Sequence, residues 1–219
     1  MSAEDRIARA KVVYELAVYG GDVGGLADAE RGLDSVEADA ALARGKLLHA
    51  RFLNDRAGGA SPVENPAELP LFERAATLYE ALGDVRGEGE ARFWIGCVHQ
   101  VIRRDDAVAV PEFERAGRLA ERGGDLPTQA EVLRHLGISA HMAGRLDEAR
   151  ERLEESSRLR RQVGNLAGVA ANMVGLAYIA LAQGRRDDAG AILDEANAIA
   201  RSQGADAIVR QIEEARAAV

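Results

Sequence analysis

The side chains that could support acid–base, nucleophilic or metal chemistry are four histidines and one cysteine: His49, His99, His135, His141 and Cys97. His135 and His141 are six residues apart, so on one helix they point to different sides and cannot share a metal ion. Zinc sites use close Cys and His spacings that this sequence lacks. We therefore expect no metal site and no cofactor.

Two pairs have a spacing that invites a catalytic reading. Cys97 and His99 are two residues apart and diverge on a helix, which argues against a nucleophile–base pair. His135 and Ser139 share a helix face, but the backbone amides around a mid-helix serine are already hydrogen-bonded and cannot stabilise an oxyanion. The sequence also lacks a P-loop and a dinucleotide-binding glycine motif that follows a strand. We expect no catalytic residues, although an enzyme assembled from distant residues stays an alternative.

Composition narrows the class of protein and of partner. Of 219 residues, 47% are apolar but only 4% are aromatic, so Ala, Leu, Val and Ile must fill the core, which favours helices. The net charge of −8 disfavours nucleic acid and anionic membranes as partners, because both are polyanions. Three short arginine runs stand beside carboxylates and are predicted to lie on solvated helix faces: 103–104, 158–161 and 185–186.

Several features favour a cytoplasmic protein. Cys97 is the single cysteine, which excludes an internal disulfide and favours a reducing compartment. The first residues are charged and amphipathic, unlike a signal peptide, and no stretch reaches 18 apolar residues. Lys11 and Lys46 are the only lysines beside many arginines, a bias typical of GC-rich bacterial genomes.

The chain repeats itself with a period of about 40 residues. A large apolar residue recurs with steps of 39, 41, 40 and 40, at Leu33, Phe72, Phe113, Leu153 and Leu193. Three residues after it a small residue recurs, at Val36, Ala75, Ala116, Ser156 and Ala196. Four residues before it stand Ala29, Glu68, Ala109, Ala149 and Ala189. A period this regular over most of the chain predicts a helical-repeat protein.

Each repeat has the pattern of two helices. In the fourth, Leu133, Leu136, Gly137 and Ala140 form one apolar helical face, and Gly144 then breaks the helix. Asp147 is placed to cap the next helix, which carries inward the residues Ala149, Leu153 and Ser156.

This spacing resembles the tetratricopeptide repeat, over roughly residues 3–204. The period is longer than the family's 34 residues and the terminal proline is missing, so the resemblance is to a longer bacterial variant. It implies a single all-α domain, 1–219: a right-handed α-solenoid of about five helix-turn-helix repeats. We place the repeats at 3–37, 38–83, 85–124, 126–164 and 166–204, and a capping helix at 205–219. Within the second repeat, the first helix is expected at 38–54 and a loop at 58–66. One extra residue before Ala109 leaves the register of the third repeat's first helix open by one residue.

The resemblance also implies that the first helices of successive repeats line a concave groove. The stripe of these helices opposite the core face is mostly apolar with a few polar groups, as in ligand pockets. Its residues are Tyr14, Phe93, Cys97, Gln100, Arg134, Ile138, His141, Met142, Val174, Tyr178 and Leu181. The alternative is that this stripe packs one repeat against the next.

The expected function is therefore a binding module that holds a protein, a peptide or a small molecule in the groove. A homo-oligomer is compatible with this function. The alternative is an enzyme that uses His99, His141 or Tyr178 as acid–base groups on a small molecule.

Overall fold

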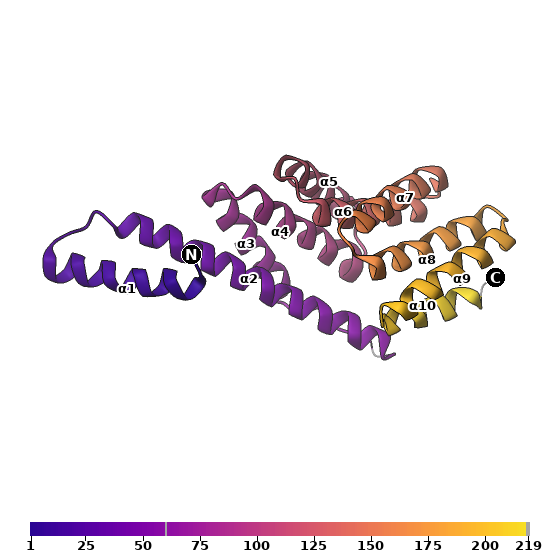
Figure 1. Ribbon diagram of the computed structural model, residues 1–219, viewed down its shortest axis with the longest axis horizontal. Helices are drawn as coiled ribbons and strands as arrows, with labels where there is room; N and C mark the ends of the chain where they lie inside the picture. The colour runs from indigo at the N-terminus through magenta and orange to yellow at the C-terminus, as the bar shows by residue number, and fades with distance from the viewer. Residues whose placement is uncertain (60, 218–219) are drawn as a thin grey trace. The chain divides into compact units, whose positions relative to one another are not determined.

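The computed structural model of the protein describes residues 1–59 and 61–217, and within these ranges all regular secondary structure is helical, without strands. Figure 1 shows the succession of helices. They are α1 (Ala3–Gly20), α2 (Leu26–Ala57), α3 (Glu68–Leu82), α4 (Val85–Cys97), the π-helix η1 (Val98–Arg103), α5 (Asp106–Gly123), α6 (Leu126–Met142), α7 (Leu146–Gln162), α8 (Leu166–Ala182), α9 (Arg186–Ser202) and α10 (Asp206–Arg216).

The helices form two compact units, 1–105 and 106–219. In the first unit α1 packs on α2, α2 on α3, and α3 on α4. In the second unit each helix from α5 to α10 packs on the next, and α10 also contacts α8. This packing of sequential neighbours in an all-α chain is the arrangement of a helical-repeat solenoid, and it confirms the expected fold class.

Burial confirms the predicted register in the second to fifth repeats. The large residues Phe72, Phe113, Leu153 and Leu193 are at most 2% exposed. The small residues three positions later, and the residues four positions earlier, are fully buried in the same four repeats. The first repeat differs, because Leu33 is 38% exposed and does not anchor a core.

Glycines set the turns between helices. Each second helix of the last four repeats is followed by a glycine with a positive φ of 62–75°: Gly83, Gly124, Gly164 and Gly204. Such a left-handed residue satisfies the last helical carbonyls and is reached by glycine without strain. Asp147 was expected to cap α7 but does not, because the helix already begins at Leu146. Asp147 lies in the first turn, where its negative charge interacts favourably with the helix dipole.

The predicted break between the first and second repeats is wrong, since α2 runs without interruption from Leu26 to Ala57. Residues 38–44 are mostly good helix formers, and Gly45 has no positive φ. Gly45 instead allows a close approach, because a Cβ there would lie 2.6 Å from the Phe72 ring of α3. The predicted 58–66 loop follows α2, and its Ala60 lies outside the described residues.

The extra residue of the third repeat lies in η1. A π-helix holds more residues per turn than an α-helix and thus takes up a one-residue insertion within a helix. Arg104, the residue after η1, has a φ of 56° and occupies the left-handed position that glycine holds at other turns.

The C-terminal helix α10 covers the last repeat over Asp206–Arg216. Ile212 and Ala215 are fully buried in one hydrophobic cluster with Leu193, and Ile208 and Val209 pack at its edge. A capping helix was expected at this position, and its last two residues, 218–219, lie outside the described residues.

Two adjacent residues of α7 test the register. We expect Leu153→Ala to lower the free energy of unfolding by about 2–5 kcal/mol, because Leu153 is buried against Ala140, Ala149 and Ile179. Arg152→Ala is expected to change it by no more than about 0.5 kcal/mol, since Arg152 is partly exposed and pairs with Glu148 on its own helix. Urea unfolding followed by circular dichroism measures both, and a larger loss for Arg152→Ala would contradict the assigned face.

Candidate functional site

In the first unit, two of the predicted groove residues are not accessible. Phe93 and Cys97 are buried in α4, so neither presents a surface to a partner. Gln100 is partly buried on η1, and Tyr14 on α1 is 58% exposed. Phe93 and Cys97 therefore fit the packing alternative.

In the second unit, the stripe on α8 also packs within the protein. Val174 is buried, and Tyr178 and Leu181 pack against the hydrophobic cluster that includes Ile212 of α10. The capping helix covers this stripe, as the next repeat would do. These three residues therefore fit the packing alternative.

The stripe on α6 is different. Arg134, Ile138 and His141 are only partly buried, and Met142 at the end of the helix is 78% exposed. The first three lie at i, i+4 and i+7 on one face. We call these four residues the α6 surface.

A polar cluster lies beside the α6 surface and joins α6, α7 and α8. We call it the Arg134 cluster, and its members are Glu131, Arg134, Ser156, Ser157, Arg160 and Asn172. Asn172 of α8 is fully buried at its centre. Its amide oxygen accepts a hydrogen bond from Arg134 Nη1 at 2.9 Å, and its Nδ2 donates to Ser156 Oγ at 2.8 Å and Ser157 Oγ at 3.1 Å.

The two serines fasten the cluster to the backbone. Ser156 Oγ donates to the carbonyl of Ala130 on α6 at 2.7 Å. Ser157 Oγ donates to the carbonyl of Leu153 at 2.7 Å, one turn earlier in α7. A buried side chain held by several hydrogen bonds has little freedom, so Asn172 presents a fixed acceptor to Arg134.

Arg160 was missed by the sequence analysis. The run 158–161 was predicted to be solvated, and Arg158 is exposed and pairs with Glu155, but Arg160 is only 4% exposed. Arg160 Nη2 donates to Glu131 Oε2 at 2.7 Å, and its Nε donates to Ser156 Oγ at 3.3 Å. Gly168 of α8 leaves room for it, since a Cβ there would lie 1.9 Å from Arg160 Nη1.

The repeat register was the signal that could have found Arg160. It lies seven residues after the anchor Leu153, and the corresponding residues Tyr79, Ala120 and Ala200 are all buried. A buried position is therefore predicted for residue 160 by the same period that defines the fold.

Burial and a second positive charge act on the Arg134 guanidinium. Desolvation is the larger cause and the nearby Arg160 the smaller one, and together they lower the pKa of Arg134 to about 10. Glu131 acts in the opposite direction but less strongly. Arg134 remains charged at neutral pH, in surroundings that destabilise that charge.

A hollow of about 360 Å³ lies on another side of α6, between α5 and α7. Its lining combines apolar side chains with charged side chains of both signs. It is lined by Glu114, Gly117, Arg118, Glu121, Gln129, Val132, Leu133, Leu136, Arg152, Glu155 and Leu159. None of these residues belongs to the predicted groove.

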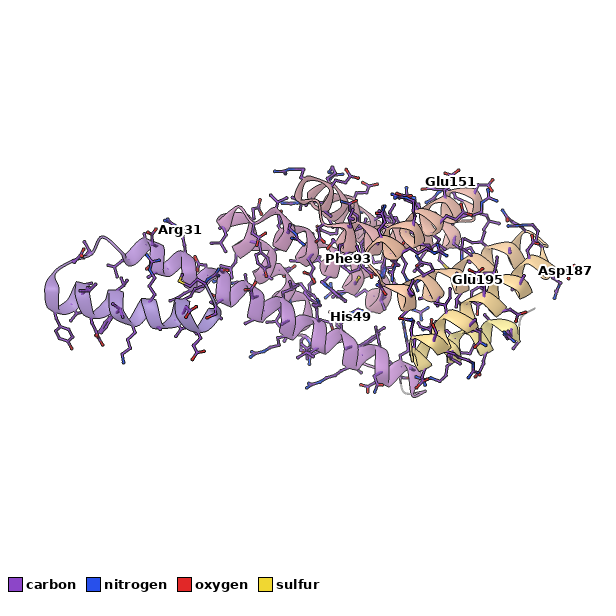
Figure 2. All side chains as sticks on the ribbon, viewed as in Figure 1. Arg31, His49, Phe93, Glu151, Asp187 and Glu195 are labelled. Carbon is purple, nitrogen blue, oxygen red and sulfur yellow. The ribbon has the colours of Figure 1, made fainter. Side chains whose placement is uncertain are left out.

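The first unit contains a buried ionisable pair. His49 of α2 and Glu68 of α3 are both buried, and His49 Nδ1 lies 2.8 Å from Glu68 Oε1. The His49 ring also meets the Trp94 ring edge-on at 5.3 Å between centroids. Figure 2 shows His49 and, on α4, Phe93, whose ring also contacts Trp94. Glu68 takes the position that alanine holds in the other repeats.

The His135 and Ser139 pair, which was considered for catalysis, lies in packed surroundings. His135 packs on Phe113 at 5.2 Å, and Ser139 is buried. Among residues 1–59 and 61–217, no group of three or more His, Cys, Asp or Glu side chains could hold a metal ion. Within the same ranges, no helix has both the length and the apolar character that crossing a membrane requires.

Comparison with known proteins adds no assignment: no family model matches the chain, and no curated protein matches its sequence.

Proposed function

We propose that the protein is a binding module of the tetratricopeptide-like kind, which holds a peptide, a protein or a small molecule at the α6 surface. The proposal concerns Arg134, Ile138, His141 and Met142, which belong to one helix of the second unit. A cytoplasmic location and partners other than nucleic acid or membrane form part of it, supported by the net charge of −8 and the single cysteine.

The observation that carries the proposal is the polar character of the fourth repeat's core. Its second helix has Ser156 where the second, third and fifth repeats have alanine, and Arg160 where the third and fifth have alanine. Burying a guanidinium is less favourable than burying alanine, so folding alone does not explain Arg160. Asn172, which donates hydrogen bonds to Ser156 and Ser157, accepts one from Arg134 and so holds this residue of the α6 surface in place.

The α6 surface has the composition of a binding site. Ile138 and the exposed Met142 supply apolar contact area, and methionine adapts its shape to different ligands. Arg134 and His141 supply directional polar groups at either end of the same stripe. Exposed carboxylates of the same unit, such as Glu151, Asp187 and Glu195 in Figure 2, lie on α7 and α9 instead.

Mass spectrometry of the natively purified protein tests this function. We expect a retained ligand or protein that is lost from Met142→Asp, because a charge would replace apolar contact at a residue that is 78% exposed and thus dispensable for folding. Val163→Asp, at the residue that follows α7 and is 40% exposed, is the control and is expected to keep the ligand. Equal retention by both variants would contradict a site on the α6 surface.

A further inference from the structure

We propose that two copies of the chain associate through the first unit, with helix α2 of one copy antiparallel to helix α2 of the other. This interface lies on the first unit, whereas the α6 surface belongs to the second, so the inference does not rest on the proposed function. It follows from an open apolar face on α2 and from the order of the charges beside that face.

The face is open because α2 has no turn where the other repeats have one. Eleven residues after each of the last four anchors stands a glycine with positive φ, at Gly83, Gly124, Gly164 and Gly204. Eleven residues after Leu33 stands Arg44, inside α2. The helix therefore continues for 32 residues, about 48 Å, and α1 with its 18 residues lies alongside only the first part of it (Figure 1).

A line of apolar residues along α2 stays exposed. Leu26, Leu33, Ala40 and Leu47 follow one another at steps of seven, which places them on one side of the helix. Leu26 and Leu33 are 38% exposed and Leu47 is 64% exposed. Ala40 is exposed as well, although it lies seven residues after its anchor, at a position that is buried in the four later repeats. An apolar line with this spacing is typical of a helix that packs against a second helix.

A line of charged residues runs beside the apolar line. Its members are Glu30, Glu37, Arg44 and Arg51, again at steps of seven and all exposed. The acidic residues lie toward the start of α2 and the basic residues toward its end. When this order is reversed and placed opposite itself, every carboxylate meets a guanidinium. The pattern thus complements a second copy of the same helix, provided that the two helices are antiparallel.

The apolar line fits this antiparallel arrangement. With the two-fold axis next to Ala40, Leu33 of one copy meets Leu47 of the second copy, and the two Ala40 residues meet at the axis. The small alanine lets the two helices approach closely where they cross. Each copy contributes the same side chains, as the isologous interface of a two-fold dimer requires.

The charged line selects the same register. With the axis next to Ala40, Glu37 faces Arg44 of the second copy and Glu30 faces Arg51 of the second copy. A parallel pair would place like charges opposite one another, which is unfavourable. Arg74 of α3 occupies two of the roughly four acceptor positions of the Glu37 carboxylate, which leaves positions for a second guanidinium.

Sedimentation velocity of the full chain tests the dimer. We expect a species of two chains that dissociates on dilution and that added salt weakens, because its charged contacts lie at an exposed edge. The amide hydrogens of α2 from Leu26 onward are expected to exchange more slowly as the protein concentration rises, since the second copy covers this helix. In a single chain, exchange does not depend on concentration.

Two charge-reversed variants test the register. Arg44→Glu with Arg51→Glu makes the charged line wholly acidic, and Glu30→Arg with Glu37→Arg makes it wholly basic. Each variant alone is expected to dimerise at least about tenfold more weakly, because four attractive contacts become repulsive. An equal mixture of the two is expected to restore the dimer as a heterodimer, which a misfolded variant could not form.

Arg31→Glu with Arg56→Glu is the matched control. It makes the same change of charge on the same helix, at two exposed residues outside both lines. This variant is expected to dimerise as the unaltered chain does.

Single added cysteines distinguish an antiparallel from a parallel pair. The native Cys97 is buried in α4 and does not interfere. Ala40→Cys is expected to form a disulfide between copies on oxidation, because the two residues meet at the axis. Leu26→Cys is expected to form none, since in the antiparallel pair its two copies lie about 43 Å apart along the helices.

A chain that stays monomeric at every concentration overturns the inference, and so does a dimer that the charge-reversed variants leave intact. Failure of the mixed variants to associate, or cross-linking through Leu26→Cys but not through Ala40→Cys, has the same consequence. None of these results bears on the α6 surface, because ligand retention is measured on a different variant.

Discussion

A chain that ends at Gly204 is expected to lose about 5 kcal/mol of stability as an upper estimate, and to aggregate. The deletion removes α10, whose Ile212 and Ala215 are fully buried and whose Ile208 and Val209 pack at the edge of the same cluster. It would expose the apolar sides of α8 and α9, including Val174. A loss of this size is comparable with the whole stability of many small domains.

Thermal unfolding by circular dichroism and light scattering measure this effect. The point variant Ile212→Ala is expected to account for about 2–5 kcal/mol by itself, because the buried side chain leaves a cavity. Glu213→Gln, next to it on the exposed side, serves as the control and is expected to stay within about 0.5 kcal/mol. A shortened chain as stable and as soluble as the full one would show that α10 is not a cap.

His49→Ala is expected to lower the free energy of unfolding by about 3–5 kcal/mol, because it leaves the fully buried Glu68 without its partner. The double variant His49→Leu, Glu68→Leu is expected to be as stable as the unaltered chain or more so. Two apolar side chains of similar size replace two polar groups whose burial is unfavourable. The other repeats have alanine at the position of Glu68, which shows that an apolar residue suits the fold there.

The pair can be followed by urea unfolding with fluorescence of Trp94, which contacts the His49 ring and is the only tryptophan. The effects of His49→Leu and Glu68→Leu must be measured singly as well, because the coupling is the difference between their sum and the double variant. Additive losses, with the double variant the least stable of all, would contradict a coupled pair.

The repeat register could be read from the sequence because it rests on residue size. Wherever Phe72, Phe113, Leu153 or Leu193 occurs, small residues three positions later allow the neighbouring helix to approach, and the structure buries both kinds. The boundary between the first two repeats could not be read in this way. No turn interrupts α2, and its glycines, Gly32 and Gly45, have no positive φ and stay within the helix.

The site residues were harder to predict, because exposure depends on what packs over a helix. Val174 and Arg134 occupy corresponding positions one period apart. Val174 is buried in a cluster to which α10 contributes, whereas Arg134 remains partly exposed. Arg160 looked like part of a solvated run by its neighbours alone, and only its place in the period indicated burial. Whether any of these residues binds a partner is a prediction for the experiments above.

The amide hydrogens of the first repeat are expected to exchange faster than those of the other repeats. Val13 is the one buried residue of α1 within the described chain, whereas α3 and α8 each bury six or more. Local opening costs little free energy where few side chains leave a core. Because α2 continues past residue 37 without a turn, opening of α1 uncovers the N-terminal part of α2, whereas Glu37 keeps its ion pair with Arg74 of α3. Exchange protection is therefore expected to rise along α2 itself, from Leu26 toward His49, within one uninterrupted helix.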